Sequence, residues 1–142
     1  MNVIYPFRIW KEDEDYLIQG FEPLENVLSY GESIEDAIKN GREALTGVLG
    51  AMLDNAQLIP EPSKLSQTEG VYGIEPDPSV AIPILVRKAR EEAGLTLVEL
   101  AAKLGVTYQA VQKWERSGTN PKVATLSRVL QALGKRLQLK VA

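Results

Sequence analysis

Residues 96–115 read T-L-V-E-L-A-A-K-L-G-V-T-Y-Q-A-V-Q-K-W-E, and this stretch predicts two short helices joined by a tight turn. Thr96 and Glu99 have the spacing of a capping box, in which each side chain accepts a hydrogen bond from a backbone N–H left unpaired at the helix start. Apolar residues then recur at helical spacing, and Gly105 supplies the backbone freedom with which helices often end. The first helix is therefore expected to end at Gly105.

The second helix is expected to begin after Thr107, whose hydroxyl can cap it. Its inward positions are apolar, at Ala110, Val111 and Trp114. Side chains that can form hydrogen bonds gather on the opposite face, at Tyr108, Gln109, Gln112 and Lys113. The same apolar spacing fits an ordinary pair of core helices, but the polar outer face favours a helix-turn-helix.

The composition excludes several kinds of chemistry. The 142 residues suffice for one ordinary domain or two small ones. Because Cys and His are both absent, disulfides, thiolate chemistry and the imidazole base are excluded, as is the commonest zinc ligand. No apolar run approaches the roughly 20 residues of a membrane span, and residues 1–10 lack the apolar centre of a signal peptide. We expect a cytoplasmic protein with no metal, no cofactor and no membrane partner.

Charge is distributed unevenly along the chain. Residues 1–78 carry 15 Asp and Glu against 5 Lys and Arg, a net charge of −10, whereas residues 79–142 carry 4 against 11, a net charge of +7. These values agree with the net charge of −3 for the whole chain. An acidic half joined to a basic half indicates two different partners, with phosphates suited to the basic half and a basic surface to the acidic half. For the acidic half, simple solvation of the surface is the alternative.

The first half predicts a small sheet. Residues 3–10 alternate with the period of a strand, and residues 16–21 return as the second strand of a hairpin. Between them, residues 11–15 (K-E-D-E-D) are too charged for anything but a turn, while residues 27–30 and 70–74 offer two further strands. Pro6 cannot donate to a ladder, so the first strand is expected at a sheet edge or with that N–H side free.

One long helix is expected between the third and fourth strands. Ser33 can cap its start, and Asp54 and Asn55 mark its end. One face is apolar and must lie on the sheet; it comprises Ile34, Ala37, Ile38, Gly41, Leu45, Val48, Leu49 and Met52. The predicted order of the first half is β-β-β-α-β.

Prolines separate the two halves. Residues 75–78 (E-P-D-P) predict a stiff, extended joint, because each proline restricts itself and its predecessor. We therefore predict a domain at residues 1–75, a linker at 76–79 and a second domain at 80–142. Ser79 is expected to cap the next helix, whose inward residues are Val86, Ala89 and Ala93.

The C-terminal end predicts a last helix at residues 123–133, followed by a strand. Leu137, Leu139 and Val141 alternate with polar residues, and this strand has no partner inside its own domain. Because an unpaired apolar edge tends to pair with another chain, we predict a homodimer or a higher even oligomer. A dimer would let two helix-turn-helix units span two half-sites on DNA.

Residues 84–133 resemble the Xre/Cro/cI-type DNA-binding domain. The likeness rests on A-R-E-E-A-G-L-T, E-L-A-A-K-L-G-V-T, A-V-Q-K-W-E-R and an N-P pair ahead of the last helix. It implies that bases are read by Tyr108, Gln109, Gln112 and Lys113. It implies phosphate contacts from Lys103, Thr107, Arg116, Thr119, Asn120 and Lys122, for each of which solvated surface is the alternative.

The same resemblance implies a structural ion pair. Arg90 and Glu115 match positions at which such domains join their first and third helices through a buried pair, since burying either charge alone would be costly. Leu97 stands where many relatives have a Gln that contacts the DNA backbone, so that contact is not expected here.

Residues 1–75 resemble the HicB antitoxin domain, a truncated ribonuclease-H-like fold. The likeness rests on an early Y-P, an acidic turn, Y-G-E-S-I-E-D-A-I-K-N-G-R-E-A-L and L-I-P-E-P-S. It departs at residues 21–27, where E-P-L-E-N replaces the usual D-L-P-G-type turn. The fold class implied is α+β: a partial ribonuclease-H-like β-β-β-α-β domain followed by an all-α helix-turn-helix domain with a C-terminal strand.

This second resemblance implies a role. HicB proteins neutralise HicA, a small mRNA-cleaving toxin, and repress the promoter they share with it. A protein that cuts RNA needs a basic surface, which an acidic partner can occupy much as phosphates would. The predicted toxin contacts are Glu12, Asp13, Glu14 and Asp15, with solubility of the turn as the alternative role.

Two other functions fit parts of the sequence. A ribonuclease-H-like shape suggests Mg²⁺-dependent RNA cleavage, but the acidic residues sit in turns and on the exposed helix face instead of converging from strands, so we expect no enzyme. The other is a stand-alone helix-turn-helix transcriptional regulator with a ligand-sensing N-terminal domain, for which the sequence offers no small convergent polar cluster.

Overall fold

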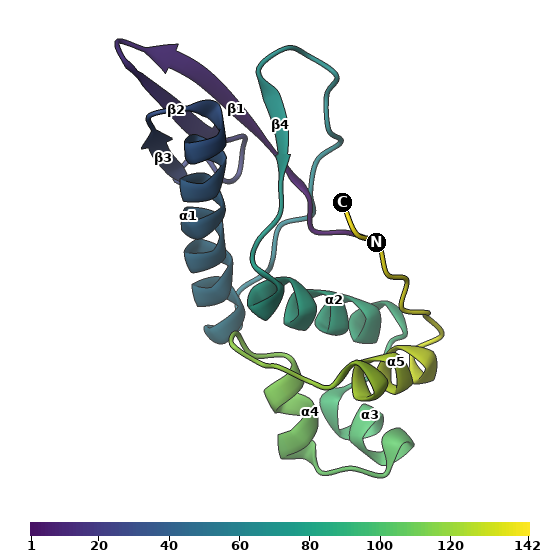
Figure 1. Ribbon diagram of the computed structural model, residues 1–142. Coiled ribbons are helices and arrows are strands. Elements are labelled where there is room, and N and C mark those ends of the chain that lie inside the picture. Colours follow the sequence, from purple (N-terminus) through teal and green to yellow (C-terminus); the bar gives the residue numbers. More distant parts are fainter.

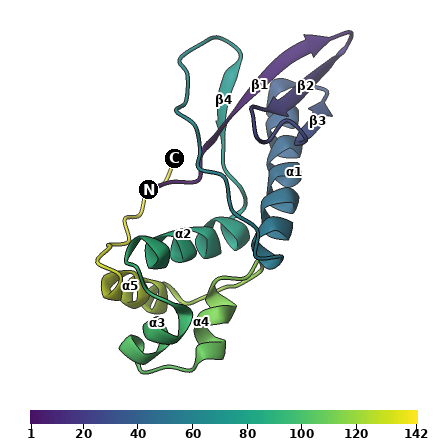
Figure 2. The ribbon, with the colours of Figure 1, turned by 180° about the vertical axis from the view of Figure 1, so that it is seen from behind.

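The computed structural model describes residues 1–142 and confirms an α+β chain with a β-β-β-α-β first half and a helical second half. The elements are β1 (Tyr5–Glu12), β2 (Asp15–Gly20), β3 (Leu28–Gly31), α1 (Ile34–Asp54), β4 (Val71–Ile74), α2 (Pro78–Glu92), α3 (Leu97–Leu104), α4 (Tyr108–Trp114) and α5 (Val123–Ala132). The sheet and α2–α5 lie at opposite ends of the molecule, and α1 runs from one to the other (Figures 1 and 2).

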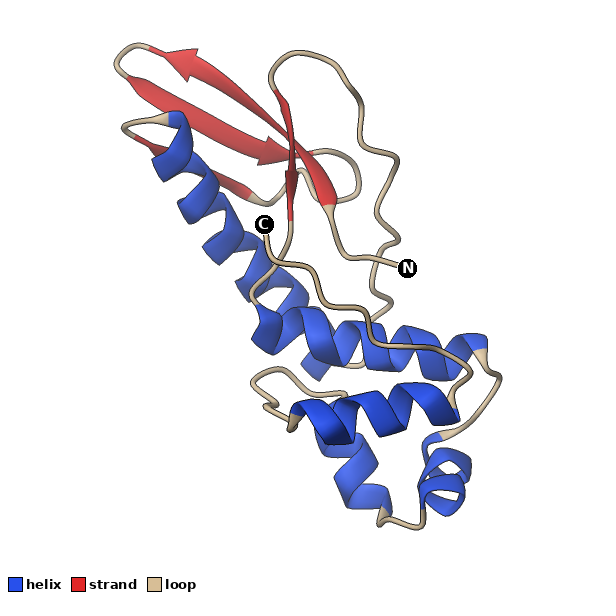
Figure 3. Cartoon of the chain, turned by 45° about the vertical axis from the view of Figure 1, so that its right-hand side comes forward, coloured by secondary structure: helices blue, strands red, loops and turns tan.

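The four strands form one antiparallel sheet in the order β3-β2-β1-β4. Helix α1 packs on one face of this sheet, and the opposite face carries no helix (Figure 3). The helix lies close to the sheet at Gly41, where a Cβ atom would lie 2.6 Å from Cδ1 of the buried Ile18 on β2. Because real side chains do not come that close, the small residue at position 41 sets how near the helix lies to the sheet.

One expectation for the hairpin was wrong, and one is confirmed. Lys11 and Glu12 extend β1, and Asp15 begins β2 opposite Glu12, so only Asp13 and Glu14 form the turn. Cross-strand pairing continues through this charged run because its side chains project into solvent. Strand β1 is central in the sheet, and its ladder with β2 starts only at Phe7, beyond Pro6. The N–H side of the strand is therefore free at the proline, which is the second of the two arrangements expected.

The long helix follows its expected limits, with Ser33 accepting a hydrogen bond from the Asp36 N–H and Asn55 at the C-cap. Most of its apolar stripe is buried or half-buried, but Ile34 is exposed because it lies at the first turn, at the end of the sheet.

The joint between the halves is packed against α1, not free. Pro76 is buried, and the Asp77 N–H donates to Thr46 Oγ1 of α1 at 2.9 Å. Asp77, not Ser79, caps α2, because its carboxylate accepts the Ser79 N–H at 2.9 Å while Pro78 occupies the first helical position. Ala93 lies at the C-cap of α2 and is exposed, so it does not face inward as expected.

The chain buries two apolar clusters, and α2 contributes to both. The first cluster lies between the sheet and α1, and it includes Val80 and Ile84 from the start of α2. The second cluster lies among α2–α5 and includes Val86 and Ala89 from the later turns of α2. The cores are therefore distinct, but they are not confined to residues 1–75 and 80–142.

The C-terminal tail does not form the strand that the sequence predicted. Residues beyond Gly134 form no strand, and Leu139 and Val141 are 80% and 96% exposed. A strand needs a partner for its backbone groups, and none is present for this tail within one chain. None of the helices has the length and apolarity needed to cross a membrane.

Candidate functional sites

The helix-turn-helix forms as its local signals require. Thr96 Oγ1 accepts the Glu99 N–H, and Glu99 accepts the Thr96 N–H, both at 3.1 Å. Gly105 ends α3 with φ of 67°, a left-handed conformation that suits glycine. Thr107 then caps α4 by accepting the Ala110 N–H at 3.1 Å. Buried Leu100, Ala101 and Val111 hold the two helices against α2 and α5.

An ion pair anchors α4 to α2. The Arg90 guanidinium donates from Nε and Nη2 to the two carboxylate oxygens of Glu115 at 2.6 and 2.9 Å. The side chains are only 13% and 8% exposed. Arg90 also donates to the Leu95 carbonyl at 2.8 Å, and its bond to Glu115 raises the pKa of Arg90. The pair fixes the C-terminal end of α4, because either charge would be costly to bury without the other.

The residues expected to read bases divide into two groups. Tyr108, Gln109 and Lys113 are exposed on α4. Gln112 is half-buried and lines a hollow with Arg90, Glu115 and other side chains at the junction with α1. The first three therefore form the free face of the helix.

Most of the residues expected to contact phosphates are accessible to solvent. Lys103, Thr107, Arg116, Asn120 and Lys122 are exposed, although the Thr107 hydroxyl is already engaged as the α4 cap. Thr119 is only 7% exposed. Its side chain is therefore less accessible to a phosphate than the exposed side chains of Lys103 and Arg116, and its expected contact stays a prediction.

The acidic hairpin projects from the far end of the sheet. Glu12, Asp13, Glu14 and Asp15 are all exposed, and none takes part in the four ion pairs of the chain. Glu12 accepts a hydrogen bond from Trp10 Nε1 at 3.3 Å. The four carboxylates are therefore a concentrated negative charge that forms no ion pair within the chain.

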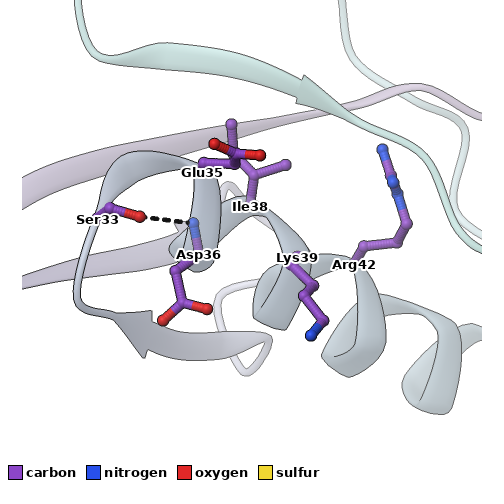
Figure 4. Close-up of a pocket in the computed structure, with 6 residues that line it drawn as sticks. All are labelled: Ser33, Glu35, Asp36, Ile38, Lys39 and Arg42. Carbon is purple, nitrogen blue, oxygen red and sulfur yellow. Dashed lines mark hydrogen bonds between the residues drawn. The ribbon is translucent and has the colours of Figure 1, made fainter.

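A further hollow lies at the start of α1. Its lining includes only one apolar residue and otherwise comprises Ser33, Glu35, Asp36, Lys39 and Arg42 (Figure 4). Small-molecule sites are mostly apolar with a few polar groups, which is the reverse of this lining. The structure holds no group of three or more His, Cys, Asp or Glu side chains positioned to bind a metal ion.

One contact between the halves was not predicted from the sequence. The Ser117 N–H and hydroxyl both donate to the carboxylate of Asp54, the last residue of α1. The next residue, Gly118, donates its N–H to the Ser79 carbonyl at 3.0 Å. Ser117 lies in the turn that follows α4, so these bonds tie that turn to the sheet half. Polar residues more than sixty positions apart give no periodic signal that could have indicated this contact.

Comparisons with known proteins agree with this arrangement. A family model described as the HicB-like antitoxin of the bacterial toxin-antitoxin system matches residues 4–88, and a helix-turn-helix model matches residues 86–140. Antitoxin HicB 2 of Photorhabdus laumondii is 26% identical over 97% of this chain and 96% of its own length. Antitoxin HicB of Escherichia coli K12 is 27% identical over 95% and 96%.

Two further matches are more limited. An uncharacterised helix-turn-helix transcriptional regulator of Methanothermobacter thermautotrophicus is 39% identical over 36% of this chain and 74% of its own length. The crystal structure of the Burkholderia pseudomallei antitoxin HicB superposes with a TM-score of 0.46 at 21% identity, covering 76% of this chain and 89% of that one. The family model spans more than half of the sequence, so this chain belongs to the HicB-like antitoxin family and carries a helix-turn-helix domain.

Proposed function

We propose that this chain binds and neutralises a HicA-type mRNA-cleaving toxin and represses the promoter of its own toxin–antitoxin operon. It does so as a binding protein without enzymatic activity or cofactor, in the cytoplasm, where its operator DNA lies. The observation that carries the proposal is the pairing of an unneutralised acidic hairpin at one end of the molecule with an exposed helix-turn-helix face at the other.

Toxin binding is assigned to the sheet half. Four exposed carboxylates on one hairpin attract a basic, RNA-binding surface and hold it away from phosphates. Occupying that surface would block RNA cleavage without any chemistry on the part of the antitoxin. Glu12, Asp13, Glu14 and Asp15 are the proposed contacts.

Operator binding is assigned to α4. Gln109 can form a bidentate pair with adenine, and Lys113 can reach guanine or a phosphate. Lys103, Arg116 and Asn120 would set the register through phosphate contacts, which carry no sequence information. A dimer formed through the tails would place two such helices on two half-sites of the operator.

Two measurements test this function separately. Cells expressing the neighbouring HicA-type toxin should grow only when this chain is co-expressed, and the purified chain should bind its own upstream DNA in preference to scrambled DNA of equal length. Growth arrest that the chain does not relieve would contradict the antitoxin role. Equal affinity for the two DNAs would contradict operator recognition.

A further inference from the structure

The sheet face opposite α1 has an apolar patch beside the acidic hairpin. Strand pairing places Leu17 opposite Tyr30, and Gln19 opposite Leu28, while the intervening Ile18 points to α1. Leu17, Leu28 and Tyr30 therefore share the outer face of the sheet. Leu28 and Tyr30 are 53% and 64% exposed, although both are large and carry apolar surface.

The patch and the hairpin carboxylates line one hollow of about 590 Å³. We call Glu12, Asp13 and Asp15 its acidic wall and Leu17, Leu28 and Tyr30 its apolar wall; Ser29 also lines it. Lys11, the nearest cation along the chain, lies over the Tyr16 ring at 5.9 Å. Residues 11 and 16 alternate with the residues of the outer face, so this lysine points to the other side of the sheet. Arg8 shares the outer face, but its guanidinium donates to Gln19 Oε1 at 2.9 Å and lies over the Trp10 ring at 5.3 Å. None of the three carboxylates that line the hollow forms an ion pair within the chain.

These two walls match one kind of side chain. An arginine or lysine has an aliphatic stem that packs on apolar surface and a cationic head that seeks carboxylates. Tyr30 adds an aromatic face of the type that attracts such a cation. A purely apolar side chain would leave three carboxylates facing it, and a small anion would be repelled.

We propose that this hollow receives an arginine or lysine side chain of the toxin, with Tyr30 and Leu28 as its apolar contacts and Asp13 and Asp15 as its charge partners. The proposal rests on the proposed antitoxin function and adds the place and chemistry of the contact. It assigns the anchoring role to the sheet face next to the hairpin, not to the hairpin tip alone.

The partner docks on the face of the sheet, not by adding a strand beside β3. Asn40 Nδ2 of α1 donates to the Tyr30 carbonyl at 2.8 Å, so one backbone acceptor of this edge strand is already occupied. At the other edge of the sheet, Ile4 and Leu65 cover the outer face at Gly73 of β4, so the open part of this face lies over β1, β2 and β3. The docking surface is therefore limited to the hollow and its rim.

The test measures the affinity of the full-length chain for its operon's HicA-type toxin, purified in a catalytically inactive form, by titration calorimetry. Tyr30→Ala and Leu28→Ala probe the apolar wall, and Asp13→Asn with Asp15→Asn probes the acidic wall. Leu58→Ala and Glu43→Gln are matched controls, because both residues are exposed and lie outside the hollow. Circular dichroism confirms that each variant is folded.

We expect each wall variant to weaken toxin binding by about tenfold or more, as for central interface residues, and the controls to change it less than about twofold. The Asp variants should also flatten the dependence of affinity on salt. Binding by the wild type with no loss in the wall variants would overturn the site but not the antitoxin function. If only the apolar-wall variants weaken toxin binding, the occupant of the hollow is not a cationic side chain, and the proposal is overturned.

A toxin that does not bind the wild-type chain would instead contradict the proposed function itself. A second copy of this chain could also bring its basic half to the hollow. Sedimentation of the chain without toxin separates this case: a smaller oligomer for Tyr30→Ala would show that the hollow is a contact between copies and would overturn the proposal.

Discussion

Asp54 at the end of α1 accepts two hydrogen bonds from Ser117, one from its backbone N–H at 2.9 Å and one from its hydroxyl. Gly50, one helical turn earlier, faces the same junction, since a Cβ atom there would lie 3.3 Å from Val80 Cγ2 and 3.6 Å from the Ser117 Cβ. The carboxylate thus connects the helix that supports the sheet to the turn after the exposed helix α4. The two proposed binding ends are joined by a specific polar contact as well as by α2.

Replacing this carboxylate should loosen the connection. We expect Asp54→Ala to lower the free energy of unfolding by about 1 kcal/mol, the usual contribution of a hydrogen bond that is partly accessible to water. Chemical denaturation with urea measures the change. Glu43→Ala, which removes an exposed carboxylate from the same helix, is the control and should have little effect. Equal stability of the two variants would show that the Ser117 contact contributes nothing.

The cap of α2 predicts a dependence of stability on pH. The N–H of Ser79 bonds to the Asp77 carboxylate and lowers the pKa of Asp77 below its ordinary value of 3.8. Because folding lowers this pKa, the charged Asp77 stabilises the fold at pH values above its unfolded pKa. This contribution to stability is lost as the pH falls through the lower pKa of the folded state.

Asp77→Asn keeps an acceptor at the cap but cannot titrate. The difference in unfolding midpoint between wild type and variant should therefore be largest near about pH 7 and should shrink toward about pH 3. Thermal unfolding at several pH values provides the comparison. A constant difference across this range would mean that Asp77 does not contribute the expected linkage.

The proposed reading of bases by Gln109 predicts a loss of affinity for the operator alone. Gln109→Ala should weaken operator binding by roughly 1–3 kcal/mol, the cost of one lost base contact, while binding to non-specific DNA stays nearly unchanged. Gel-shift titrations with both DNAs measure this, and Gln131→Ala on α5 serves as an exposed glutamine control. An equal loss on both DNAs would show that Gln109 does not read bases.

The proposed pairing of two C-terminal tails predicts a dimer that depends on residues 137–142. Deletion of residues 137–142 should weaken dimerisation without unfolding the chain, because Leu139 and Val141 contribute nothing to either core. Analytical ultracentrifugation gives the oligomer size, and circular dichroism reports the helix content. An unchanged dimer in the truncated chain would contradict pairing between tails.

A shortened chain tests the separation of the two functions. A fragment that ends at Lys88 should fold and bind the toxin but not the operator, since every proposed DNA contact lies beyond it. A fragment that ends at Asp77 lacks the buried side chains of Val80 and Ile84, each of which stabilises the fold by about 1.5–3 kcal/mol. We expect this shorter fragment to be much less stable.

Co-expression of each fragment with the toxin, scored by growth, makes the comparison, and thermal unfolding of each shows which is folded. If a folded fragment ending at Lys88 fails to restore growth, the toxin-binding surface must extend into α3–α5.

Local signals in the sequence predicted much of what the structure contains. Thr96, Gly105 and Thr107 marked the limits of the helix-turn-helix, because caps and turns depend on neighbouring residues. Ser33 and Asn55 did the same for α1. The pairing of Arg90 with Glu115 was expected only from the family resemblance, since residues twenty-five positions apart carry no periodic signal.

Tertiary packing decided the remainder. It buried Thr119 and half-buried Gln112, which left Tyr108, Gln109 and Lys113 as the open face of α4. It placed Val80 and Ile84 in the core of the preceding half, although the prolines before them indicated a boundary. Strand order brought Tyr30 beside the carboxylates of the hairpin. Such contacts depend on how elements pack and on how strands pair in space, which residue spacing along a single chain does not encode.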